Sequence, residues 1–196
     1  MYSIDKNIDN TIILKKSKFI TKLYRTDSIE EINNILNNIK SEYQDATHIC
    51  YGYILNEIEK CSDDGEPSKT AGIPILNVLK KNNLTNVLAI VIRYFGGIKL
   101  GAGGLLRAYS NSIIEALKKA NIVELTEGYL VELEFKHDQI KLVDYLLNGK
   151  EIINKNYDNN VIYSFYLSKD ELNFVSELEK IAIHLSLKDK VLITKN

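Results

Sequence analysis

The segment that decides the fold reads VLAIVIRYFGGIKLGAGGLLRAYS over residues 87–110. Residues 87–95 are almost continuously apolar and β-branched, which is typical of a central strand covered on both faces. Half of the chain's ten glycines follow, all of them between residues 96 and 104. From about residue 105, apolar side chains recur at helical intervals as far as Ala120. The pattern therefore predicts a buried strand, a glycine-rich loop and a helix in direct succession.

A glycine-rich loop that leads from a strand into a helix can bind an anion with its backbone N–H groups and the positive end of the helix. The spacing is not that of a dinucleotide-binding loop, because Leu106 stands where the third glycine would follow Gly101 and Gly103. No Gly-Lys-Ser/Thr follows either, which excludes a Walker A loop. The structural alternative is that the glycines only allow positive φ angles and close packing of the loop on the helix.

The charge pattern around this loop favours an anionic partner. The whole chain has a net charge of −1, yet no Asp or Glu occurs between Pro67 and Ile114. Arginine suits phosphate because its planar guanidinium donates two parallel hydrogen bonds. We predict an anion-binding or nucleic-acid-binding site made of Arg93, Gly96, Gly97, Lys99, Gly101, Gly103, Gly104 and Arg107. An internal salt bridge from these cations to the acidic residues just upstream is the alternative.

Those acidic residues lie in a strong turn signal, Asp-Asp-Gly-Glu-Pro over residues 63–67. Thr70 is predicted to be the N-cap of a helix that runs through Lys81. The strand predicted over 47–58 has small and partly polar side chains on one face, His48 among them. The loop facing the anion site is expected to contain His48, Asp63, Asp64, Glu66 and Thr70.

The same residues allow two enzyme hypotheses. His48 and the acidic turn could bind a metal ion in a metal-assisted hydrolase similar to a peptidase, since imidazole and oxygen ligands suit such ions. No HExxH motif supports this, and no residue is assigned as a metal ligand. Cys50 or Ser110, together with His48, could serve as a nucleophile, although the spacing does not require it. No cofactor is predicted.

The rest of the chain predicts two domains, residues 1–125 and residues 126–196. In the first, an alternating strand or hairpin over 11–25 is followed by a capping box and a helix as far as Tyr43. From residue 128 onward the order is strand, helix, hairpin, helix, strand. This βαββαβ order is the split βαβ, ferredoxin-like arrangement. The fold class is therefore α+β with two domains.

Composition limits the class of protein. At 196 residues, 45% hydrophobic and 26% charged, the chain is long and apolar enough to bury a core, which excludes disorder. There is no apolar run long enough to span a membrane and no signal peptide. Cys50 and Cys61 form no CxxC pair and are expected to be free thiols. These features predict a cytoplasmic location.

Two long motifs resemble those of the YigZ/IMPACT family: SDDGEPSKTAGIPIL over 62–76 and IRYFGGIKLGAGGLLRAYS over 92–110. Smaller pieces at 17–20 and 46–48 are also similar. Lys69 departs from the family pattern, which more often has a small residue there. The resemblance implies a ribosomal protein S5 domain 2-like N-terminal domain and a ferredoxin-like C-terminal domain similar to the last domain of elongation factor G.

The resemblance also implies a role in translation or its stress response, because the eukaryotic member of the family is a translation regulator. That regulator acts through an additional N-terminal domain, so its partner is not carried over. RNA or the ribosome is the expected partner, bound through the glycine-rich loop. A protein partner in the translation machinery, docked on the sheet of the C-terminal domain, is the alternative. The oligomeric state is not predicted.

Overall fold

The computed structural model describes residues 1–195 and divides them into two compact units, one spanning Met1–Val123 and one beginning at Glu124. The boundary predicted at residue 125 lies two residues beyond this division. Both units combine helices with an antiparallel sheet, in agreement with the predicted two-domain α+β class. No helix in this described part of the chain is long and apolar enough to cross a membrane.

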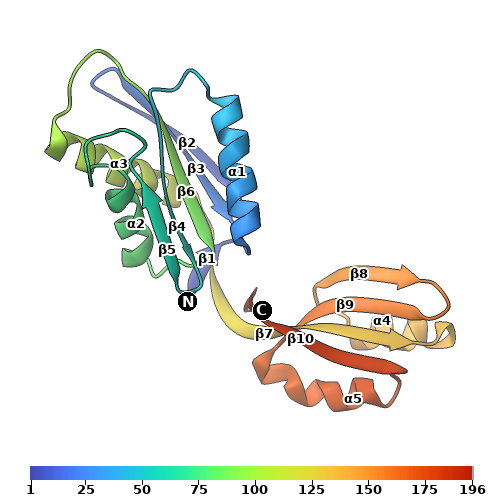
Figure 1. Cartoon of the computed structure of the whole chain (residues 1–196). Coiled ribbons are helices and arrows are strands. Elements are labelled where there is room, and N and C mark those ends of the chain that lie inside the picture. Colours follow the sequence, from blue (N-terminus) through green and yellow to red (C-terminus); the bar gives the residue numbers. More distant parts are fainter. Residues whose placement is uncertain (196) are drawn as a thin grey trace. The chain divides into compact units, whose positions relative to one another are not determined.

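The first unit contains a five-stranded sheet with the strand order β2-β3-β6-β4-β5 (Figure 1). Its strands are β2 (Ile8–Leu14), β3 (Ser17–Arg25), β6 (Val87–Tyr94), β4 (His48–Leu55) and β5 (Ile58–Ser62). A short strand, β1 (Tyr2–Ile4), precedes them. The strand predicted over 87–95 is confirmed as the central one, since β6 pairs with β3 on one side and β4 on the other.

Helices cover both faces of this sheet. α1 (Ile29–Glu42) packs on one face through Ile32, Leu36 and Ile39, while α2 (Gly72–Lys81) and α3 (Ala102–Leu117) pack on the other. Figure 1 shows α1 on the side of the sheet opposite α2 and α3. Two separate apolar cores therefore enclose β6.

Three local predictions are corrected. β5 was not predicted, because it is short, its first three residues are exposed and two of them, Glu59 and Lys60, are charged. Thr70 is not an N-cap: α2 begins at Gly72, and the Thr70 hydroxyl donates to the Pro67 carbonyl at 2.6 Å. α3 begins at Ala102 rather than near residue 105.

The second unit has the predicted βαββαβ order. It consists of β7 (Ile122–Phe135), α4 (Ile140–Leu146), β8 (Ile152–Tyr157), β9 (Val161–Ser168), α5 (Val175–Glu179) and β10 (His184–Thr194), with 3-10 turns at His137–Gln139 and Lys169–Phe174. The strands pair in the antiparallel order β10-β7-β9-β8. The capping box at Ser168 and Glu171 is present, but it opens the second 3-10 turn instead of a continuous helix.

Candidate anion-binding cleft

A buried ion pair joins the end of β6 to the acidic turn. Arg93 Nη1 donates to Glu66 Oε1 at 2.5 Å, and the two residues are only 5% and 7% exposed. Arg93 also stacks between the rings of Phe19 and Phe95, with its guanidinium carbon 5.4 and 5.6 Å from their centroids. The pair brings together two residues that the sequence assigned to opposite sides of the site. For Arg93, the structure therefore has the internal salt bridge that the sequence offered as the alternative to anion binding.

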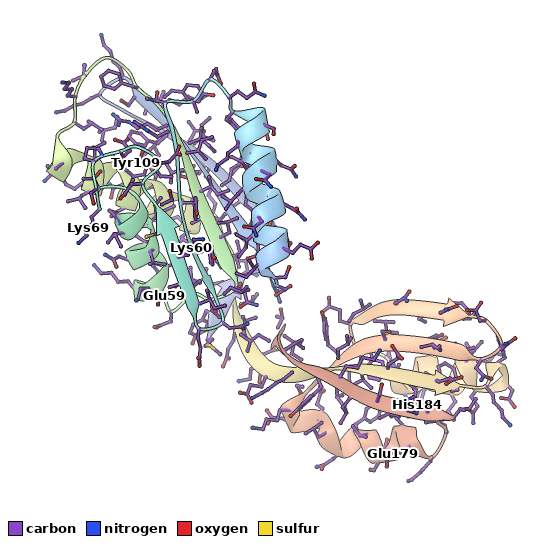
Figure 2. All side chains as sticks on the ribbon, in the orientation of Figure 1. Glu59, Lys60, Lys69, Tyr109, Glu179 and His184 are labelled. Atoms are coloured by element: carbon purple, nitrogen blue, oxygen red, sulfur yellow. The ribbon has the colours of Figure 1, made fainter. Side chains whose placement is uncertain are left out.

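The same carboxylate extends the network into the core. Tyr109 on α3 donates its hydroxyl to Glu66 Oε1 at 2.8 Å, and the Cys50 thiol lies 3.4 Å from that hydroxyl. Tyr109 is fully buried, and Figure 2 shows it inside the first unit. Burial raises the pKa of Cys50 to about 12, so the thiol stays protonated at neutral pH. Because the thiolate is the nucleophile, this position of Cys50 argues against the cysteine-nucleophile hypothesis.

Asp63 organises the turn as a backbone acceptor. Its carboxylate accepts hydrogen bonds from the N–H groups of Lys69, Ala71 and Gly72 at 2.7, 2.9 and 2.8 Å. Lys69 itself has a φ of 65° and an exposed side chain (Figure 2). Desolvation opposes the charge on Asp63, but the three backbone hydrogen bonds outweigh it and lower the pKa of this carboxyl. Asp63 therefore fixes the start of α2.

Replacing Asp63 with Asn should destabilise the protein in a pH-dependent way. A lowered pKa in the folded state adds stability that is complete above the unfolded-state pKa and is lost as the pH falls through the folded value. We expect Asp63→Asn to reduce the unfolding free energy by about 2 kcal/mol at neutral pH. The difference from wild type should shrink between about pH 5 and pH 2.

Urea denaturation followed by circular dichroism at several pH values measures both quantities. Asp9→Asn is the matched control, because the Asp9 side chain is 71% exposed and pairs with Lys22. That change should cost less than about 1 kcal/mol. A loss for Asp63→Asn that is the same at pH 7 and pH 3 would contradict the assignment.

Asp64 and His48 lock the turn onto β4. The Ile49 N–H donates to Asp64 Oδ2 at 2.6 Å, and His48 Nδ1 lies 2.8 Å from the Asp64 carbonyl oxygen. Since a carbonyl oxygen can only accept, Nδ1 must carry the hydrogen. His48 Nε2 then lies 3.9 Å from Glu66 Oε2. The imidazole is thereby held in one orientation next to the buried carboxylate.

Gly101 immediately precedes α3, and its φ of 71° lies in the region that favours glycine. The Gly101 carbonyl accepts the first intrahelical hydrogen bond, from Leu105 N at 2.9 Å. Within α3, all of which is described, no side chain caps the N-terminus and no acidic residue occupies the first turn. The amides at the start of the helix are thus available to an external acceptor.

An open cleft of about 420 Å³ joins these features. Polar side chains of β4, the acidic turn and β6 line it together with apolar side chains and the start of α3. The lining residues are Thr47, His48, Glu66, Pro67, Arg93, Phe95, Lys99, Leu100, Gly101, Ala102 and Leu105. Phe95, which is 45% exposed, presents an aromatic ring to this cleft.

Residues 15–117, more than half of the chain, match the Impact N-terminal domain. The chain belongs to the IMPACT family. This confirms the resemblance seen in the two long motifs. Both motifs contribute to the cleft, the first through Glu66 and Pro67 and the second from Arg93 to Leu105.

Relatives within the IMPACT family match most of this chain. It is 37% identical over 181 residues to the IMPACT family member YvyE of Bacillus subtilis, covering 90% of this chain and 83% of that protein. It is 35% identical over 157 residues to the IMPACT family member YigZ of Escherichia coli, covering 76% of each. A crystal structure described only as a hypothetical protein has a TM-score of 0.65 and 30% identity, covering 93% of this chain and 97% of that one.

The structure separates the predicted site residues of this IMPACT family chain into three groups. His48, Glu66, Arg93, Lys99 and Gly101 line the cleft. Asp63, Asp64 and Thr70 hold the turn through hydrogen bonds to backbone groups. Outside the cleft lining, as far as residues 1–195 are described, lie Gly96, Gly97, Gly103, Gly104 and Arg107.

The metal-hydrolase alternative lacks a ligand set. Asp63 and Asp64 already accept backbone hydrogen bonds, and Glu66 accepts from Arg93 and Tyr109. Throughout the described part of the chain, no group of three His, Cys, Asp or Glu side chains could hold a metal ion.

Sequence reasoning missed Ser17 and Thr47 as supports of the site. The Ser17 hydroxyl accepts from Gly96 N at 3.2 Å and lies 3.5 Å from Arg93 Nη2. The Thr47 hydroxyl accepts from Phe95 N at 2.9 Å. Both are single hydroxyls far from the loop in the sequence, and only the smaller motif pieces at 17–20 and 46–48 pointed to them.

Proposed function

We propose that this protein binds RNA of the translation machinery through phosphate groups held at the start of α3. The observation that carries the proposal is the uncapped N-terminus of a 16-residue helix that opens into a cleft. A helix N-terminus attracts anions through its free N–H groups and its partial positive charge. Family membership supports the translation context, since the resemblance implies such a role.

The balance of charge at the cleft favours phosphate. Glu66 neutralises Arg93, whereas Lys99 is exposed and makes no ion pair with any described residue. Arg107 is also exposed and lies on α3, about 7.5 Å along the helix axis from Ala102 at 1.5 Å per residue. Lys99 and Arg107 can therefore contact different phosphates of one partner.

The binding free energy expected of one phosphate contact favours a polymeric ligand over a single phosphate. A helix N-terminus contributes about 0.3–2 kcal/mol to the binding of one anion. One such contact gives only weak affinity, whereas several phosphates on one chain add their contributions and release counterions. A polymer with many phosphates, such as RNA, is therefore the expected ligand, and its affinity should fall steeply as the salt concentration rises.

The test measures RNA affinity at a series of salt concentrations for wild type and for Lys99→Ala/Arg107→Ala. Each lost phosphate contact should reduce the slope of log K against log[salt] by about one. The control is Lys60→Ala/Lys119→Ala, which removes the same charge from exposed positions outside the described cleft lining. An unchanged slope in the Lys99/Arg107 variant, or binding insensitive to salt, would refute the proposal.

Binding to ribosomes distinguishes the alternative partner. RNA binding through α3 should be lost when ribosomal RNA is digested by nuclease. Co-sedimentation that survives the digestion would favour the protein-interaction hypothesis.

A further inference from the structure

At the base of the cleft two hydrogen-bond acceptors face each other. The hydrogen on His48 Nδ1 points to the Asp64 carbonyl, which leaves the Nε2 lone pair of the neutral ring directed elsewhere. Nε2 lies 3.9 Å from Glu66 Oε2. That distance is too long for a direct hydrogen bond, even when the imidazole is charged.

Glu66 Oε2 can still accept hydrogen bonds. Glu66 Oε1 accepts from Arg93 and from Tyr109, but no hydrogen bond reaches Oε2 from the residues that the structure describes. The Glu66 side chain is only 3% exposed, so a partner for this oxygen has to approach through the cleft. Arg93 Nε, in the same cleft, is a buried atom that has no partner in the described chain. Buried polar atoms without partners carry a free-energy cost that a ligand group can remove.

A single hydroxyl group can reach both atoms from one side. An oxygen there can lie within hydrogen-bond distance of both atoms, because they are only 3.9 Å apart. Its one hydrogen can go to the carboxylate or to Nε2 of the neutral ring, but not to both. When the imidazole is charged, the hydroxyl donates to the carboxylate and accepts from Nε2–H. Hydrogen bonds to a charged group are the stronger kind.

The neighbouring groups indicate which hydroxyl this is. The same cleft is lined by Ala102 at the start of α3, by Lys99 and by the exposed ring of Phe95. Phosphate, sugar hydroxyl and base are the corresponding parts of a ribonucleotide, since aromatic rings stack on bases and the 2′-hydroxyl distinguishes RNA from DNA. We propose that His48 Nε2 and Glu66 Oε2 receive a ribose 2′-hydroxyl, so that the cleft selects RNA over DNA. This inference rests on the proposed function.

The experiment compares single-stranded oligoadenylates of one length with ribose, deoxyribose or 2′-O-methyl-ribose sugars. All three carry the same base and phosphates, so their affinities differ only through the sugar. Wild type should bind the ribose form about tenfold more tightly than the other two, the effect of one hydrogen bond to a charged group. The 2′-O-methyl form controls for sugar geometry, because it resembles RNA but cannot donate.

Two variants locate the selectivity. His48→Ala removes one acceptor, whereas Glu66→Gln keeps an oxygen for Arg93 and Tyr109 and places an amide NH₂ where Oε2 was. That NH₂ cannot accept a hydrogen from the hydroxyl. Both variants should lower the preference for ribose to about twofold or less while retaining salt-dependent binding. His137→Ala, at an exposed histidine of the second unit, should leave the preference unchanged.

The outcomes separate the two proposals. Equal, salt-dependent binding of all three oligoadenylates would overturn the ribose inference and leave the phosphate site standing. A ribose preference that persists in both variants would overturn it as well. If no oligoadenylate binds, the proposed function fails and the inference fails with it.

Discussion

Glu66→Ala is expected to lower the unfolding free energy by about 3–5 kcal/mol, the loss typical of removing one partner of a buried ion pair. The guanidinium of Arg93, only 6% exposed at its side chain, would remain charged in the interior without its carboxylate. The Tyr109 hydroxyl would lose its acceptor in the same step. Chemical denaturation followed by circular dichroism measures the change.

Two comparisons show whether the buried charge causes this loss. Glu59→Ala removes a carboxylate from an exposed pair with Lys80 on the surface shown in Figure 2, and it should cost less than about 1 kcal/mol. Glu66→Met with Arg93→Met removes both charges, and it should recover a large part of the stability. A loss below about 1 kcal/mol for Glu66→Ala would mean that Arg93 finds another partner.

The strand-loop-helix segment was predictable because its physical signals are local. Residues 87–92 are all fully buried, as the unbroken apolar run indicated. The start of α1 was also predictable: Ser28 Oγ accepts from Glu31 N at 3.1 Å, although the Glu31 side chain reaches Asp27 N instead of Ser28 N. Short-range patterns of this kind determine elements without reference to the rest of the chain.

The partner of Arg93 was not predictable in the same way. Local charge pattern placed Arg93, Lys99 and Arg107 in one set, but burial separates them: Arg93 is inside, and the other two are exposed. Only the pairing of β4 with β6, which sets His48 opposite Arg93, brings the acidic turn to the guanidinium. Pairing across the sheet depends on tertiary contacts that no window of sequence contains.

The burial of Arg93 reduces the number of cations available to an anion, but the anion-binding hypothesis still has Lys99 and the start of α3. Three cations converging on the loop would have been a strong anion site, whereas the structure leaves Lys99 and the start of α3 at the cleft and Arg107 exposed outside the cleft lining. Arg93 acts instead as a positioning residue, because it holds Glu66 with one carboxylate oxygen facing His48. The buried pair of Arg93 and Glu66 therefore fixes the geometry of the cleft, and the exposed Lys99 gives it positive charge.

Gly96→Ala tests how far the glycine-rich loop depends on close packing, and it should be among the most damaging changes in the first unit. A Cβ at this position would lie 2.0 Å from the backbone carbon of Lys16 and 2.5 Å from Ser17 N. The β2–β3 turn cannot yield easily, since Lys15 and Lys16 both have positive φ angles. Moving it would also draw Ser17 away from Arg93, so we expect a loss of about 3 kcal/mol or more.

Gly103→Ala is the matched control from the same loop and helix. No described heavy atom comes within 4 Å of a Cβ built on Gly103, which lies in the first turn of α3. Alanine there should leave stability unchanged or raise it by up to about 1 kcal/mol, because it favours helix and restricts the unfolded chain. Equal effects of the two substitutions on the denaturation midpoint would show that Gly96 is not in close contact with the turn. A large loss confined to Gly96→Ala would assign this glycine to packing and leave anion binding to the start of α3.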